Sequence, residues 1–391
     1  DFIHVSGGNT IKRGSSMPAP GTSPAPHAHC SEEIKKHVNI PVATVARINE
    51  PWVAEELIEN DKCDMCMIGR ANLCDSEFAN KAFEGKTDDI RPCIGCGRCL
   101  TGIMMGKRIS CTVNPSVEDD TVEKATEKKK VLVIGGGPAG MEAAYVAHQR
   151  GHEVVLCEKS NELGGQLRIA AVPIAKQELC RVIKYMKRRL DNSGIEVRLN
   201  TEVTEEMLNN EFKDYEIICS CGAISKEIPP FEIFKNCMIA DEVLSGSKYP
   251  GRNIVVLGGG SVGCETADFL APLINDLFPM NRKVTILEMT NSLMPGEGGA
   301  AKSRLTQRLM QNGVNIEMSA QVTKVDENTI TYVKNGVEHV INDADTLIFA
   351  VGYIPKKIEI NSDKVHYIGD CDKVGTLRDA ITQAHELATN L

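Results

Sequence analysis

Four cysteines have the spacing of an iron–sulfur ligand set. Cys93, Cys96 and Cys99 follow one another as C-x2-C-x2-C, and Cys111 lies twelve residues further on. Three thiolates at this spacing wrap one face of a [4Fe-4S] cluster, and a distant fourth closes it. The same cysteines could hold a structural zinc ion, and the first two could form a redox-active disulfide. The sequence favours the cluster and leaves these two alternatives open.

A glycine motif that suits a dinucleotide follows the cysteines. A short apolar run leads directly into Gly135, Gly137 and Gly140, spaced as G-x-G-x-x-G, and a helical pattern comes next. Such glycines let backbone amides at a helix N-terminus approach a pyrophosphate. The next apolar run ends at Glu158, whose carboxylate can accept hydrogen bonds from a ribose diol. We therefore predict a strand, a turn and a helix that bind a dinucleotide.

The same pattern returns later in the chain. Gly258, Gly260 and Gly263 follow a second apolar run, and the strand predicted after them ends at Glu288. A carboxylate at that point repels a 2′-phosphate and pairs with a free 2′-hydroxyl. This second unit is therefore predicted to bind NAD(H), although the nearby Lys283 leaves NADP(H) open.

Composition limits the class of protein. The 391 residues are 42% hydrophobic and 25% charged, as in ordinary globular proteins of two to three domains. The net charge of −9 gives no basic surface for nucleic acid or an anionic membrane, and no apolar run reaches the length of a membrane span. Fifteen cysteines in so long a chain favour an intracellular protein over a secreted disulfide scaffold. We expect a cytoplasmic protein without nucleic-acid or membrane partners, and a homo-oligomer stays possible.

The elements that must position these residues are strands that alternate with helices, as in α/β proteins. Three short apolar runs near the start each precede a helical pattern, which predicts parallel strands covered by helices. Three such units cannot close an eight-unit barrel by themselves. A charged stretch without apolar periodicity then reads as a linker before the first glycine motif. The predicted divisions are residues 1–90, the cysteine segment and linker at 91–127, a first nucleotide domain at 128–245 and 350–391, and a second at 246–349.

Several motifs resemble those of two-dinucleotide flavoproteins. They are residues 162–166, 219–223, 349–355 and 367–370, in that order. In such proteins the closing Asp binds the ribityl chain of FAD, and the next helix faces the flavin. The resemblance implies FAD contacts from Gly135, Gly137, Pro138, Ala139, Gly140, Glu158, Lys159, Gly165, Gln166, Ala223, Gly369, Asp370 and Thr376. It implies NAD contacts from Gly258, Gly260, Val262, Gly263, Glu288 and Gly352.

Almost the whole chain resembles the C-terminal part of the family of 2,4-dienoyl-CoA reductase, 2-enoate reductase and trimethylamine dehydrogenase. The matching pieces are residues 45–51, 67–70, 88–96 and 111–115. This resemblance implies that residues 1–90 are the end of an FMN-binding (β/α)8 TIM barrel, followed by a [4Fe-4S] segment and two Rossmann-like domains. It also implies FMN phosphate contacts from Ala46, Arg47, Gly69 and Arg70.

The resemblance further implies an activity. We expect electrons to pass from NADH through FAD and the cluster to FMN, which reduces the activated C=C bond of an enoate or enoyl-CoA. An amine dehydrogenase like trimethylamine dehydrogenase, with ADP in place of FAD, is one alternative, and an electron-transfer subunit for a separate catalytic chain is another. The sequence begins at Asp1 without Met, so we expect a longer natural chain. Most of the barrel and its proton donor would then precede Asp1, and no catalytic residue is assigned.

Overall fold

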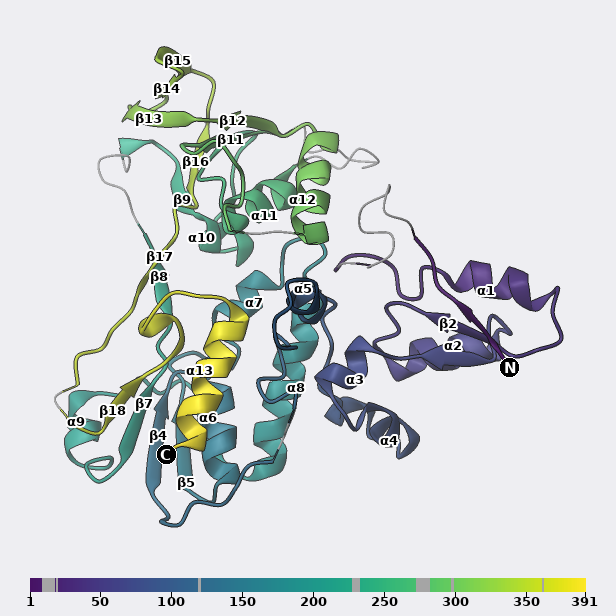
Figure 1. Cartoon of the computed structure of the whole chain (residues 1–391). Helices are drawn as coiled ribbons and strands as arrows, with labels where there is room; N and C mark the ends of the chain where they lie inside the picture. Colours follow the sequence, from purple (N-terminus) through teal and green to yellow (C-terminus); the bar gives the residue numbers. More distant parts are fainter. Residues whose placement is uncertain are drawn as a thin grey trace. The chain divides into compact units, whose positions relative to one another are not determined.

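The chain forms two compact units. The computed structural model describes residues 1–8, 18, 20–118, 121–226, 233–271, 282–296, 299–360 and 362–391 (Figure 1). Unit 1 consists of residues 1–168, 178–223 and 355–391, and unit 2 of residues 169–177 and 224–354.

Unit 1 opens with a small parallel sheet. Its strand order is β1-β2-β3, and Val45 at the end of β2 pairs with Met67 at the end of β3. The carboxyl ends of these strands therefore meet at one edge. Pro51 starts the helix after β2, at a position where its missing N–H is not needed. The elements are β1 (Ile3–Val5), α1 (Ala28–Lys35), β2 (Val42–Val45), α2 (Pro51–Glu59), β3 (Met65–Met67), α3 (Arg70–Cys74), α4 (Phe78–Phe83), η1 (Thr87–Asp89) and α5 (Arg98–Met104).

A five-stranded parallel sheet, in the order β18-β7-β4-β5-β6, forms the rest of unit 1. The central strand β4 is apolar and buried after its first residue, as expected for a parallel strand covered on both faces. Helix α13 packs on α6, and α6 packs on α8 (Figure 1). The elements are β4 (Lys130–Ile134), α6 (Pro138–Gln149), β5 (Glu153–Cys157), α7 (Gln166–Ala170), α8 (Glu178–Ser193), β6 (Glu196–Arg198), α9 (Glu205–Asn209), β7 (Glu216–Cys219), β18 (Val365–Tyr367), η3 (Gly369–Cys371) and α13 (Leu377–Thr389).

One buried ionic network joins these three helices. The carboxylate of Glu142 in α6 accepts hydrogen bonds from Arg189 of α8 at 2.8 Å and from His385 of α13 at 3.3 Å. The Arg189 guanidinium also lies 3.6 Å from the centre of the Tyr145 ring. Burial alone would raise the pKa of Glu142, but Arg189 and His385 outweigh burial and hold it at about 2. The network therefore stabilises the packing of α6, α8 and α13 while its carboxylate is ionised.

Unit 2 repeats the parallel arrangement. Its five-stranded sheet has the order β12-β11-β10-β16-β9, and β13, β14 and β15 form an antiparallel sheet. The duplication predicted from the two glycine motifs is thus present as two parallel sheets. The elements are β8 (Ala223–Ser225), β9 (Cys237–Ile239), α10 (Ala240–Leu244), β10 (Asn253–Leu257), α11 (Ser261–Leu270), β11 (Lys283–Glu288), α12 (Gly299–Gln311), β12 (Asn315–Met318), β13 (Ala320–Val325), β14 (Ile330–Lys334), β15 (Val337–Ile341), β16 (Thr346–Phe349) and β17 (Tyr353–Pro355).

The predicted mixed α/β class with parallel sheets is confirmed by these elements. Within the described part of the chain, no helix combines the length and apolar character that crossing a membrane requires.

Candidate functional site

The glycines of the first motif have three different structural roles. Gly135 has φ +104°, and a Cβ there would lie 2.6 Å from the Ser220 carbonyl oxygen. A Cβ on Gly140 would lie 1.9 Å from the Gly135 carbonyl oxygen, so helix α6 approaches β4 this closely only with glycine. Gly137 precedes Pro138 at the start of α6, and a Cβ on it would meet no atom within 4 Å. The open face at Gly137 leaves room for a pyrophosphate at the helix N-terminus.

Glu158 lies at the end of β5 with its carboxylate against the glycine turn. Its Oε2 accepts from the Gly136 backbone N–H at 2.6 Å, and its Oε1 accepts from the Ser160 N–H at 2.8 Å. The side chain is buried, whereas Lys159 next to it is exposed. The acid predicted to bind a ribose diol is therefore fixed beside the predicted pyrophosphate position.

A second glycine turn lies against the first. Gly165 has φ +52°, and a Cβ there would lie 3.0 Å from the Gly137 Cα. The adjacent Gln166 donates its side-chain N–H to the Ala223 carbonyl oxygen at 3.3 Å. The fold thus brings together three predicted FAD segments that are well separated in the sequence.

The closing motif, residues 367–370, lies against the first turn of α6. A Cβ on Gly369 would lie 3.0 Å from the Ala139 Cβ in the first turn of α6. Asp370 follows, and its Oδ1 accepts from the Gly375 N–H at 2.9 Å. Burial raises the pKa of Asp370. Thr376 caps α13, so this helix begins beside the predicted ribityl-binding carboxylate.

Unit 2 carries the same geometry in its own glycine turn. Gly258 has φ +108°, and a Cβ on Gly263 would lie 2.0 Å from the Gly258 carbonyl oxygen. Gly260 directly precedes α11, and a Cβ on it, as on Gly137 in unit 1, would meet no atom within 4 Å. Glu288 accepts from the Gly259 N–H at 2.6 Å. The two units therefore share one arrangement of turn, helix and acid.

Two further predicted NAD contacts flank this turn. Val262 lies in the first turn of α11. Gly352, with φ +103°, lies two residues beyond Ala350, whose carbonyl oxygen is 2.5 Å from where a Gly258 Cβ would be.

The predicted cluster ligands surround one small hollow. Cys93, Cys96, Cys99 and Cys111 line it together with Arg70. Backbone N–H groups of residues 95, 100, 113 and 114 hydrogen-bond to these sulfurs, which suits thiolates that hold a cluster. In the ranges that the structure describes, no three His, Cys, Asp or Glu side chains are grouped closely enough for a single metal ion. The donor set and its amides fit a cluster, and the fold brings all four cysteines together.

A fifth cysteine, which sequence reasoning missed, lies beside them. The fully buried thiol of Cys74 hydrogen-bonds to Cys111. This bond, helped by the backbone N–H groups of Asn114 and Val113, lowers the pKa of Cys111 to about 6. Burial raises the pKa of Cys93 to about 12. A lone cysteine far from the motif has no spacing by which the sequence could have singled it out.

The predicted FMN residues lie at one edge of the small sheet. Ala46 and Arg47 follow β2, and Gly69 and Arg70 follow β3. Ala46 has φ +91°, a left-handed backbone that favours glycine. Both arginines contact protein groups: buried Arg47 pairs with Glu178, and Arg70 donates to the carbonyl oxygens of residues 18 and 95 at 3.2 and 3.5 Å. The four residues therefore lie at one sheet edge, and the Arg47 guanidinium is committed to an ion pair.

Comparisons with known proteins define the class. Residues 129–373 match the family model of pyridine nucleotide-disulphide oxidoreductases. The chain is similar to bilirubin reductase of Mediterraneibacter gnavus, with 35% identity over 100% of this chain and 62% of that protein. It is similar to cinnamate reductase of Clostridium sporogenes, with 33% identity over 92% and 55%. These matches place the chain among the NAD(P)H-dependent flavin oxidoreductases.

A solved structure shares the fold. The fold matches a 2-naphthoyl-CoA reductase complex with a TM-score of 0.91 and 23% identity, over 100% of this chain and 60% of that one. The chain belongs to the family of 2-enoate and 2,4-dienoyl-CoA reductases that carry a pyridine nucleotide-disulphide oxidoreductase domain. It spans 55% and 62% of the length of the two curated relatives.

Proposed function

We propose that this chain is the electron-input part of an iron–sulfur flavoprotein. When bound, FAD, a [4Fe-4S] cluster and FMN would carry electrons from NADH to the activated C=C bond of an enoate or enoyl thioester. The part of the predicted domain 128–245 and 350–391 that lies in unit 1 would hold FAD, unit 2 would hold NADH, and residues 91–127 would hold the cluster. Residues 1–90 would supply strand–helix units of an FMN-binding barrel.

One observation carries this proposal: the four cysteines line a single hollow, within the same unit as the first dinucleotide fold. A structural zinc site would explain the cysteines but not their place beside a flavoprotein domain. Amide donors aimed at the sulfurs stabilise thiolates and influence the reduction potential of a cluster.

The substrates named for the relatives indicate the chemical class of the electron acceptor. Cinnamate, named in one of them, is an α,β-unsaturated carboxylate. 2-Naphthoyl-CoA, named in the solved structure, is an aryl thioester with a conjugated carbonyl. Both names support an activated unsaturated acid or thioester as the electron acceptor of the whole protein.

FAD, rather than ADP, is favoured by two carboxylates in one unit. Glu158 suits the adenosine ribose, and Asp370 suits the ribityl chain that only the flavin nucleotide has. The test is to denature the purified chain and identify the released nucleotides by chromatography and mass. FAD is expected, and Asp370→Ala should lower its content while the exposed Asp363→Ala should not. Release of ADP from the unmodified chain would contradict the proposal.

A further inference from the structure

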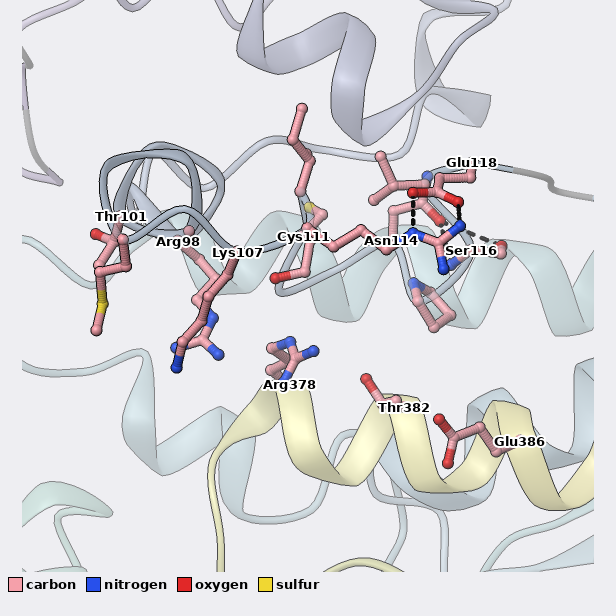
Figure 2. A pocket seen from close by; sticks show the side chains of 17 residues that line it. Arg98, Thr101, Lys107, Cys111, Asn114, Ser116, Glu118, Arg378, Thr382 and Glu386 are labelled. Atoms are coloured by element: carbon pink, nitrogen blue, oxygen red, sulfur yellow. Dashed lines mark hydrogen bonds and ion pairs between the residues drawn. The ribbon is translucent and has the colours of Figure 1, made fainter.

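Unit 1 contains a second hollow whose lining includes none of the predicted nucleotide contacts. It has a volume of about 600 Å³ and lies between residues 98–118 of the cysteine segment and helix α13 (Figure 2). Arg378, Thr382 and Glu386, each four residues apart, form the wall that α13 contributes. The volume is in the range of small-molecule sites.

The lining of this hollow is cationic, although the chain has a net charge of −9. Four basic side chains and two carboxylates line it, which leaves two positive charges in excess. Arg108 pairs with Glu118 through two guanidinium nitrogens. Among the described residues, neither Arg98 nor Lys107 has a carboxylate oxygen within 4 Å, although the charge of Arg98 helps to lower the pKa of Asp379. Two of the four cations, Arg98 and Lys107, are therefore available to hold an anion.

Arg378 adds a donor that lacks an acceptor. Its Nε is buried and has no hydrogen-bond partner in the described part of the chain, and its Nη1 lies 3.9 Å from Asp379. Figure 2 shows Arg378 at the start of α13, across the hollow from Arg98 and Lys107, which extend into it from the cysteine segment. An anion in the hollow would contact the exposed part of this guanidinium, whose side chain is 29% exposed, and not the buried Nε.

We propose that this hollow binds a small phosphorylated molecule. Arginine binds phosphate oxygens through paired N–H groups, and a dianionic phosphate would neutralise the two excess charges. Thr382 and Glu386 lie further along α13, where they can hydrogen-bond to hydroxyls of the organic part. Arg98 and Cys111 also line the cysteine hollow, so the bound phosphate would lie next to the cluster segment. The site goes beyond the proposed electron path and does not depend on it.

The test measures binding without turnover. The FAD-loaded chain is saturated with NAD⁺, so that both glycine turns are occupied, and titrated in a calorimeter with inorganic phosphate, glycerol 3-phosphate and uncharged glycerol. Both phosphates should bind and glycerol should not. Tighter binding of glycerol 3-phosphate would identify an ester as the ligand, and equal binding would identify the free ion.

Matched variants locate the site. Arg378→Gln and Arg98→Gln should each weaken phosphate binding about tenfold, equivalent to about 1.4 kcal/mol. Arg108→Gln should have a smaller effect because Glu118 already neutralises that guanidinium, and exposed Lys213→Gln should have none. Exposed Arg98 serves as the second variant should Arg378→Gln unfold the unit. Absence of phosphate binding, or binding unchanged in Arg98→Gln, would overturn the proposal.

Discussion

Adding a single methyl group to either of two glycines should separate the two roles of the first glycine motif, which are close packing of α6 on β4 and approach of the dinucleotide. In Gly140→Ala the new Cβ would lie 1.9 Å from the Gly135 carbonyl oxygen and 2.6 Å from the Ser220 Oγ. In Gly137→Ala the new Cβ would meet nothing within 4 Å, and the backbone φ of −74° suits alanine. The first substitution therefore disturbs the protein itself, and the second disturbs only what approaches the helix N-terminus.

The magnitudes follow from these contacts. Because nonbonded heavy atoms lie about 3.5 Å apart, Gly140→Ala must move α6 from β4 by roughly 1.5 Å. Overpacking of this kind costs about 1–3 kcal/mol, so the unfolding midpoint of the apoprotein should fall by several degrees. Gly137→Ala should leave the apoprotein equally stable or about 0.5 kcal/mol more stable, because alanine restricts the unfolded chain. Its methyl should weaken FAD binding about 100-fold, or about 2.7 kcal/mol.

Thermal unfolding of the apoproteins and FAD titration by flavin fluorescence measure the two effects. The matched pair in unit 2, Gly260→Ala and Gly263→Ala, should repeat the pattern for NADH while FAD affinity stays unchanged. Wild-type FAD affinity in Gly137→Ala would refute the reasoning. So would a loss of apoprotein stability in Gly137→Ala equal to that in Gly140→Ala.

Three further predictions follow from other parts of the chain. The pKa of Glu142 is about 2 when folded and 4.5 in its ordinary state, so its stabilisation of about 3 kcal/mol is present above pH 4.5 and is lost as the pH falls toward 2. Denaturant titrations should show Glu142→Gln less stable than wild type at pH 7, with a smaller difference at pH 3; a constant difference would contradict this assignment. Ala46→Gly should stabilise the chain by about 1 kcal/mol, because φ is +91° at this position and glycine adopts that backbone without strain. A lower unfolding midpoint in this variant would contradict the assignment of backbone strain to Ala46. Glu288→Gln keeps an oxygen for the Gly259 N–H but removes the charge that repels a 2′-phosphate. Rapid-mixing measurements of flavin reduction should then show the preference for NADH over NADPH falling about tenfold, and Glu338→Gln, an exposed control, should leave it unchanged.

The nucleotide folds were predictable because their signals are local. An apolar run, a glycine turn and a helical pattern occupy one short stretch, and an acid at the end of the next strand must return to that turn in a parallel sheet. The hydrogen bonds from Gly136 to Glu158 and from Gly259 to Glu288, both 2.6 Å, have this arrangement. The parallel pairing of β2 with β3 likewise follows from repeated strand–helix units.

The rest of the site depends on contacts that spacing does not encode. Cys74 reaches Cys111 because α3 lies against the cysteine segment, where the Asn114 side-chain N–H donates to the Leu73 carbonyl oxygen. Arg47 was predicted to hold a phosphate, yet it pairs with Glu178, which is 131 residues away. In the sequence, nothing distinguishes Arg378 from other residues of a predicted helix. Its place in the hollow depends on the packing of α13 beside residues 98–118. Residues that act through long-range packing were therefore missed or given a partial role.

Reduction of the purified chain by NADH tests the central claim most directly. The chain is titrated with NADH without oxygen, and its flavin absorbance and low-temperature electron paramagnetic resonance spectrum are recorded together. We predict that the flavin bleaches and that the signal of a reduced [4Fe-4S] cluster appears, with the signal absent in Cys99→Ser. Bleaching of the flavin without any cluster signal, in a chain that contains zinc instead of iron, would contradict it.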